Sequence, residues 1–245
     1  MKIYLVNLRR AGSWWIYALL SAIIVIATIL GIILEPIGIR GAADAVISEG
    51  IKAVVIDPGH GGEDCGAIGC SGVLEKDLNL QISMIIGELL EEKGFNVVYT
   101  RTDDRMLYRP EENIKGMRKL SDLKSRVRIS EENLGAIFVS IHMNSFGDSK
   151  YSGLQVYAKD KDADSTALAE SIRREVVSTC EPENKRAVKA GDKIYVLEKN
   201  TNTSVLIECG FLSNKEECER LSQKEFQKEL SFSVVCGIIK YMEEN

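Results

Sequence analysis

Short, largely apolar runs that alternate with segments of helical periodicity constrain the fold of this chain most strongly. Strands that are apolar on both faces are typical of parallel sheets covered by helices on both sides. The pattern predicts an α/β fold: a single domain with a mixed, largely parallel sheet of about six strands and helices on both faces. The expected strands are 52–57, 95–101, 135–141, 154–158, 193–198 and 204–208, and the expected helices are 75–93, 122–133, 164–179 and 224–242, with a long loop at 105–120.

The N-terminus carries a separate apolar segment. Residues 14–34 contain no charged residue, which is long enough for a helix that spans the hydrocarbon core. Basic residues precede the segment and Glu35 follows it, so residues 1–13 are expected in the cytoplasm. The alternative is a cleaved signal peptide, whose apolar core is usually shorter, about 7–15 residues. Under both interpretations a linker at 35–50 leads to an exported domain at 51–245, anchored to the membrane or secreted.

Charge and cysteine content narrow the options further. The net charge is −5 and no long block of Lys and Arg occurs, so no nucleic-acid partner is expected. An exported domain can hold disulfides, and six cysteines are present. Cys65 and Cys70 are close enough to bridge across a loop, whereas Cys209 and Cys236 lie in apolar runs and are expected as buried thiols. The spacings leave the pairing open.

The two histidines of the chain each follow an expected strand. His60 ends the run VVIDPGH, His142 ends IFVSIH, and Glu208 ends SVLIE. The carboxyl ends of parallel strands form ligand sites in α/β sheets. Glu75 follows a glycine-rich loop that is long enough to fold back and bring this carboxylate beside His60. We therefore expect these four side chains to meet.

Two imidazoles and one carboxylate form a zinc site with an open fourth position, where the metal acidifies water and polarises a carbonyl. His60, Glu75 and His142 supply that ligand set, and Glu208 remains as base and acid. Each residue also has a simpler interpretation: a histidine after a strand can be a loop or core residue, and Glu75 can be a helix-start carboxylate favoured by the dipole. Glu208 is harder to dismiss, because an acid inside VLIECGF needs a partner or a function. The residues alone favour a metal hydrolase without naming its substrate.

At these residues the chain resembles the amidase type 3 family, zinc enzymes that cleave the bond between N-acetylmuramic acid and L-alanine. The resemblance implies that His60, Glu75 and His142 bind one Zn²⁺ and that Glu208 is the catalytic glutamate. It covers about residues 52–243, in the order VVIDPGHGGEDCGAIG, GVLEKDLNL, VVYTRTDD, DLKSRVRISEEN, IFVSIHMNS, SGLQVYA and IYVLEKNTNTSVLIECGFLSN.

The resemblance also singles out supporting residues. Asn144 follows His142 in the S-I-H-x-N segment and is expected to support the site. Arg126 and Arg186 match positions where the family commonly carries arginine, and a structural ion pair is the alternative for both. Cys65 and Cys70 depart from the pattern, since they place thiols inside the metal loop.

Within the family, the chain is most similar to the spore-cortex amidases. The similarity rests on the single N-terminal apolar segment, the absence of a wall-binding repeat, and the insertion NIKGMRKLSDLKSRV. Such enzymes remove the peptide from muramic acid so that muramic-δ-lactam can form. The resemblance implies peptidoglycan strands and the membrane as partners, the forespore envelope space as location, and an accessory protein that aids metal binding or activity as a further option.

Two other functions stay open at this point. One is a zinc peptidase that cuts within the stem peptide. The other is a membrane-anchored wall-binding or regulatory protein with a degenerate site.

Overall fold

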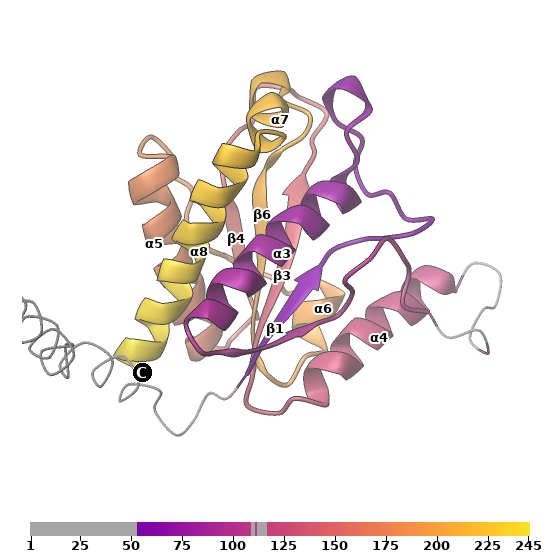
Figure 1. Cartoon of the computed structure of the whole chain (residues 1–245), viewed down its shortest axis with the longest axis vertical. Helices are drawn as coiled ribbons and strands as arrows, with labels where there is room; N and C mark the ends of the chain where they lie inside the picture. The colour runs from indigo at the N-terminus through magenta and orange to yellow at the C-terminus, as the bar shows by residue number, and fades with distance from the viewer. Residues whose placement is uncertain (1–52, 109–110, 112–116) are drawn as a thin grey trace, which may run out of the picture. The chain divides into compact units, whose positions relative to one another are not determined.

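The described part of the chain is built on one mixed sheet. The computed structural model describes residues 53–108, 111 and 117–245. Its six strands follow the order β2-β1-β3-β6-β4-β5, and only the pair β4–β6 is antiparallel (Figure 1). The predicted α/β architecture with a largely parallel sheet is therefore confirmed. The strands are β1 (Ala53–Pro58), β2 (Asn96–Tyr99), β3 (Ile137–Asn144), β4 (Gln155–Ala158), β5 (Lys189–Ala190) and β6 (Thr203–Phe211).

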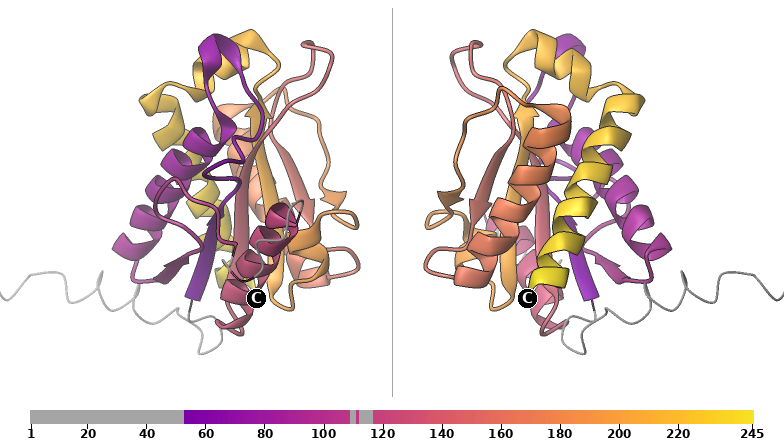
Figure 2. Two further views of the ribbon diagram at one scale, coloured as in Figure 1. Left: turned by 90° about the vertical axis from the view of Figure 1, so that its right-hand side faces the viewer. Right: turned by 90° about the vertical axis from the view of Figure 1, so that its left-hand side faces the viewer.

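Helices cover both faces of the sheet. On one face α3 (Glu75–Glu92), α5 (Ala163–Cys180) and α8 (Lys224–Glu244) bury the larger apolar core. On the other face α4 (Arg118–Glu131) and the short α6 (Tyr195–Glu198) bury a smaller one. The right-hand view of Figure 2 faces α5 and α8, and the left-hand view faces α4. Burial on both faces explains why the central strands are apolar throughout.

The strand order determines where the candidate site residues lie. β1, β3 and β6 are parallel neighbours, so their carboxyl ends lie at one edge of the sheet. In this register His142 lies beside Glu208 on the adjacent strand. Apolar side chains of β3 point into the larger core, and the alternate positions, His142 among them, point to the α4 and α6 face. His142 and Glu208 therefore approach the carboxyl edge of the sheet from the α4 and α6 face.

Two expectations about elements need correction, and two elements had no prediction. The run 193–198 is not a strand: Ile194 immediately precedes the short helix α6, which buries Val196 and Leu197. The edge of the sheet is instead occupied by β5, which has only two residues. α4 begins at Arg118, inside the expected loop, and α7 (Lys215–Leu221) had no prediction.

The structure pairs two of the cysteines whose connectivity the sequence left open, and they are far apart along the chain. Cys70, in the short helix η1 (Cys70–Gly72), forms a disulfide with Cys218 of α7, with Cα atoms 6.1 Å apart. Figure 1 shows this loop and α7 side by side at the top of the molecule. Cys65 is unpaired. Cys209 is buried as predicted, whereas Cys236 is only partly buried.

The N-terminal predictions lie outside the described residues. This applies to the apolar segment 14–34 and to the linker 35–50. No helix in the described part of the chain is long and apolar enough to cross a membrane.

Candidate metal centre

The turn after β1 sets the position of His60. His60 adopts a left-handed backbone conformation with φ 60°, and Gly61 and Gly62 follow with positive φ. A β-carbon at Gly59 would overlap the His142 ring, so only glycine allows this close approach. The result is a tight turn that directs the His60 ring toward the end of β3. Its Nδ1 lies 2.9 Å from Asp64 Oδ2.

The glycine-rich loop presents Glu75 as predicted. Glu75 is the first residue of α3 and is buried. Its Oε2 accepts a hydrogen bond from the Ala67 backbone (2.8 Å), and its Oε1 accepts one from the Met143 backbone (3.1 Å). A β-carbon at Gly66 would lie 2.5 Å from Glu75 Oε2 and 2.8 Å from His60 Cδ2, so the loop leaves room for the carboxylate alone.

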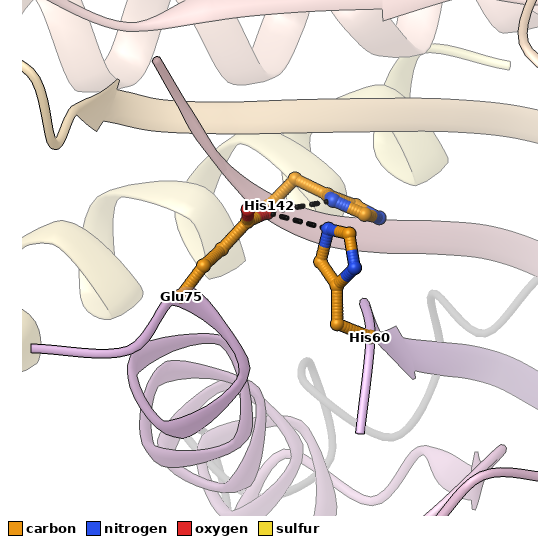
Figure 3. Close-up of side chains that lie close together, drawn as sticks. All are labelled: His60, Glu75 and His142. Atoms are coloured by element: carbon orange, nitrogen blue, oxygen red, sulfur yellow. Dashed lines mark hydrogen bonds and ion pairs between the residues drawn. The ribbon is translucent and has the colours of Figure 1, made fainter. Parts of the chain in front are cut away.

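His60, Glu75 and His142 form one cluster (Figure 3). Glu75 Oε1 lies 3.1 Å from His60 Nε2 and 2.9 Å from His142 Nδ1. The two imidazole rings meet edge to face, with centroids 4.9 Å apart. Burial opposes the charge of Glu75, but the hydrogen bonds and charges of His142 and His60 outweigh it and hold its pKa well below the ordinary value.

The donor set fits a divalent cation. One atom from each of His60, Glu75 and His142 lies within 4.8 Å of the others, and two nitrogens with one carboxylate oxygen are ligands that zinc takes at about 2.0–2.2 Å. Both ring nitrogens of His60 face carboxylates, since Asp64 lies on its far side. Such an outer carboxylate fixes the orientation of a metal-binding imidazole. Without a cation the same carboxylates raise the pKa of His60, although burial acts to lower it.

Glu208 lies next to the cluster and outside it. Its partner across the ladder is His142 on one side and Gln155 on the other. Burial raises the pKa of Glu208 to about 7, and the charge of Glu75 adds to this while His142 acts against it. Its Oε2 is buried and has no hydrogen-bond partner among the described residues. A carboxyl in this state can take up and release a proton near neutral pH.

Arg126 holds the turn after β1 through several hydrogen bonds. It is 2 % exposed, and its guanidinium donates to Asp57 Oδ1 (2.7 Å) and Asp122 Oδ2 (2.7 Å). It also donates to the backbone carbonyls of Pro58 (2.7 Å) and His60 (2.6 Å). Arg126 thus forms the buried ion pair that was one of the two interpretations of this residue.

The other two supporting candidates lie nearer the surface. The Asn144 carbonyl accepts a hydrogen bond from the Leu212 backbone (2.8 Å), and its half-buried side chain has no partner among residues that the structure describes. Arg186 makes no ion pair among the described residues, and its Nε donates a hydrogen bond to the Ser152 carbonyl (3.1 Å). Its guanidinium lies over the Phe211 ring, 4.9 Å from the centroid.

Sequence reasoning missed part of the support. Arg101 is 1 % exposed and donates to the carbonyls of Pro58 (3.0 Å) and Gly59 (2.9 Å). Asp57 accepts from Thr100 Oγ1 (2.6 Å) and Ser140 Oγ (2.7 Å) as well as from Arg126. The available signal was an acid that ends the apolar run of β1, since a buried carboxylate requires partners.

The family follows from comparison with known proteins. A family model described as N-acetylmuramoyl-L-alanine amidase matches residues 54–240. The chain belongs to this amidase family. It is thus a hydrolase of the class that the resemblance implied, and its substrate class is peptidoglycan.

Among relatives, the amidase is 35 % identical over 195 residues to the germination-specific N-acetylmuramoyl-L-alanine amidase of Bacillus subtilis, covering 79 % of this chain and 81 % of that protein. Among solved structures, it resembles the CwlD amidase of Clostridioides difficile in complex with the GerS lipoprotein, with 39 % identity and a TM-score of 0.76 over 79 % of this chain and all of that chain. It also resembles the amidase AmiC2 of Nostoc punctiforme, with 35 % identity and a TM-score of 0.67 over 78 % of this chain and 97 % of that chain. The amidase is therefore CwlD-like.

Proposed function

We propose that this chain is a zinc-dependent amidase that removes the stem peptide from muramic acid in spore-cortex peptidoglycan. The observation that carries the proposal is the convergence of His60, Glu75 and His142 beside Glu208. These are the residues that the sequence pattern assigned to metal binding and to proton transfer.

The metal-binding part of the proposal assigns one atom to each ligand residue. His60 would bind through Nε2, His142 through Nδ1, and Glu75 through its carboxylate. Zn²⁺ held there supplies a Lewis acid that polarises the lactyl carbonyl and makes nearby water more acidic.

Glu208 has the proton-transfer role. It takes a proton from the attacking water and passes it to the L-alanine nitrogen as that amine leaves. Its Oε2 has no hydrogen-bond partner among the described residues, and its pKa is about 7. Both properties suit a group that first accepts a proton and then donates it. Asn144, two residues after His142, is proposed to support the bound substrate from the end of β3.

We also propose that the domain is exported behind segment 14–34, as a membrane-anchored or a secreted protein. The Cys70–Cys218 disulfide supports this, because such bonds persist in oxidising compartments and are rare in the cytosol. The membrane would then be a partner through that segment alone.

The cortex role rests on relatives. One is described as germination-specific, and another was solved in complex with a lipoprotein. We therefore propose a role in muramic-δ-lactam formation and an accessory protein that aids metal binding or activity. Spores that lack this chain should lack the lactam, and unchanged lactam content would refute the cortex role.

Product analysis tests the reaction itself. The full chain is incubated with purified peptidoglycan, with and without a chelator, and the products are identified by mass. Release of intact stem peptides that stops with chelator supports the proposal. Shortened peptides would indicate a zinc peptidase, and binding without products would indicate a wall-binding protein.

A further inference from the structure

A cavity lies beside the carboxyl end of β6. It measures about 770 Å³. The backbone amides of Gly153, in its wall, and of Phe211, at the end of β6, both donate 2.8 Å hydrogen bonds to the buried carboxylate of Glu217. The cavity wall is thereby fixed to the strand that carries Glu208. The lining residues lie at positions 152–153, 180–186, 214, 216–217 and 220.

Most of the buried charge in this cavity is already paired. Arg220 lies 2.9 Å from Glu181 Oε1 and 3.4 Å from Glu217 Oε1. The second oxygen of Glu181 accepts hydrogen bonds from the Leu154 backbone and the Asn184 side chain, each 2.8 Å long. These groups therefore serve the wall of the cavity and have little capacity left for a ligand.

Arg186 is different because its position is fixed while its charge is unpaired. Its Nε donates to the Ser152 carbonyl (3.1 Å), and its guanidinium lies 4.9 Å from the Phe211 ring centroid and 6.0 Å from that of Tyr151. The backbone nitrogen of Arg186 donates a hydrogen bond to Asn184 Oδ1 (2.9 Å). Its two terminal nitrogens have no hydrogen-bond partner in the described part of the chain. A guanidinium held in this way presents a fork that matches a carboxylate.

The surroundings make this attraction local. Glu183 and Glu216 are exposed and also line the cavity, so there is no general positive field. Lys185 lines the cavity next to Arg186, but no ring or hydrogen bond from the described residues holds its side chain. An anion is therefore drawn to the Arg186 guanidinium itself.

The distance to the reaction centre selects which carboxylate can bind. Phe211, whose ring lies against the Arg186 guanidinium, follows Glu208 by three residues on β6, which is about 10 Å along the strand. In an extended peptide the α-carboxyl of the second stem residue lies about 7 Å from the scissile carbonyl. The next carboxyl groups of the stem lie about one residue or more farther away.

We propose that Arg186 binds the free α-carboxylate of the second, γ-linked glutamate of the stem peptide and discriminates against stems in which this group is an amide. The inference rests on the proposed amidase function and adds a substrate preference to it. A carboxamide presents one acceptor and one donor to a guanidinium that can only donate, so one hydrogen bond of the fork is lost.

The test uses two muropeptides that differ only in this group, α-carboxylate or α-carboxamide. The full chain is compared with Arg186→Gln, Arg186→Lys and the matched charge control Lys185→Gln, and kcat/KM is measured for each substrate. We expect the native chain to prefer the carboxylate by about tenfold, which corresponds to about 1.4 kcal/mol. Arg186→Gln should bring this ratio close to one, Arg186→Lys should give an intermediate ratio, and Lys185→Gln should keep it within twofold of the native value.

An equal rate on both substrates by the native chain, or an unchanged preference in Arg186→Gln, would overturn the inference. A native chain that cleaves neither substrate would refute the proposed function instead. In that case binding of the two product dipeptides, L-Ala-γ-D-Glu and its α-amide, decides the matter by calorimetry. Equal Kd values for the two would then refute the role of Arg186.

Discussion

Replacement of Arg126 by methionine should strongly destabilise the domain. The change removes the positive partner of Asp57 and Asp122, which are 1 % and 4 % exposed, so solvent does not screen the loss. Breaking a buried ion pair by removing one partner costs about 3–5 kcal/mol. A domain of this size loses roughly 2–4 °C of Tm per kcal/mol, so the expected decrease in Tm is roughly 6–20 °C.

The pH dependence of this loss has a definite sign. Burial acts to raise the pKa of Asp57, but the charge of Arg126 and the hydrogen bonds from Thr100 and Ser140 outweigh it and lower the pKa. Asp57 therefore contributes stability above its ordinary pKa, and the contribution disappears as the pH falls through the lowered value. In Arg126→Met the carboxyl regains a proton more easily. The deficit relative to the native chain should be complete at pH 7 and should shrink at acid pH.

The measurement is urea unfolding at several pH values, together with zinc content. The matched control is Arg128→Met on the same helix, whose ion pair with Glu132 is exposed and 3.4 Å long, and which should change stability by no more than about 0.5 kcal/mol. Arg126→Met should also bind zinc less tightly, because the His60 carbonyl loses its donor. A loss below about 1 kcal/mol at pH 7 would refute the assignment of this network as the support of the turn.

Three other perturbations probe the site and its loop. Glu208→Gln should keep zinc bound but lower kcat by about 10²–10⁴, and normal turnover would remove Glu208 from proton transfer. Burial raises the pKa of Glu208 to about 7, so the metal-free native chain pays a growing cost at this residue as the pH rises from about 4.5 through 7. Metal-free Glu208→Gln should therefore be the more stable protein at pH 8 in thermal unfolding. His60→Ala should lose both zinc and activity, and stoichiometric zinc by elemental analysis would argue against a ligand role. Cys70→Ser should destabilise the domain by about 2–4 kcal/mol in urea unfolding. Reduction of the native chain should have the same effect. Equal stability before and after reduction would exclude a structural role for the disulfide.

The convergence of His60, Glu75 and His142 was predictable because the positions of all three depend on strand ends and one loop. His60 and His142 each end an apolar strand, and parallel strands bring such ends together, so their spacing along the chain does not matter. Glu75 needed one further step, the expectation that a glycine-rich loop folds back. The structure confirms that geometry, since Glu75 lies beside His60.

The environments of Arg126 and Arg186 could not be predicted from the sequence. Arg126 and Arg186 are both arginines in polar stretches, but Arg126 lies on the buried face of α4 while Arg186 lies over an aromatic ring at a cavity. Burial depends on which helix covers which strand, and this is a property of the tertiary structure. The pairing of Cys70 with Cys218 has the same origin, because the two residues are 148 positions apart.

The misassigned segment 193–198 shows a limit of periodicity. The run IYVLE is short, and a short apolar run satisfies both a strand and a helical turn. In the folded chain the sheet ends at the two-residue β5, and the segment covers the sheet face as α6 instead. Packing against the smaller core therefore decided what propensity left open.

The place of β6 in the sheet determines when the candidate site can be completed during synthesis. β6 is the last strand to be made, yet it lies between β3 and β4 in the finished sheet. A nascent chain that stops before residue 203 contains all three metal-binding candidates but no Glu208, and it leaves two strand edges unpaired. An incomplete chain without β6 would therefore lack the residue that is proposed to transfer the proton.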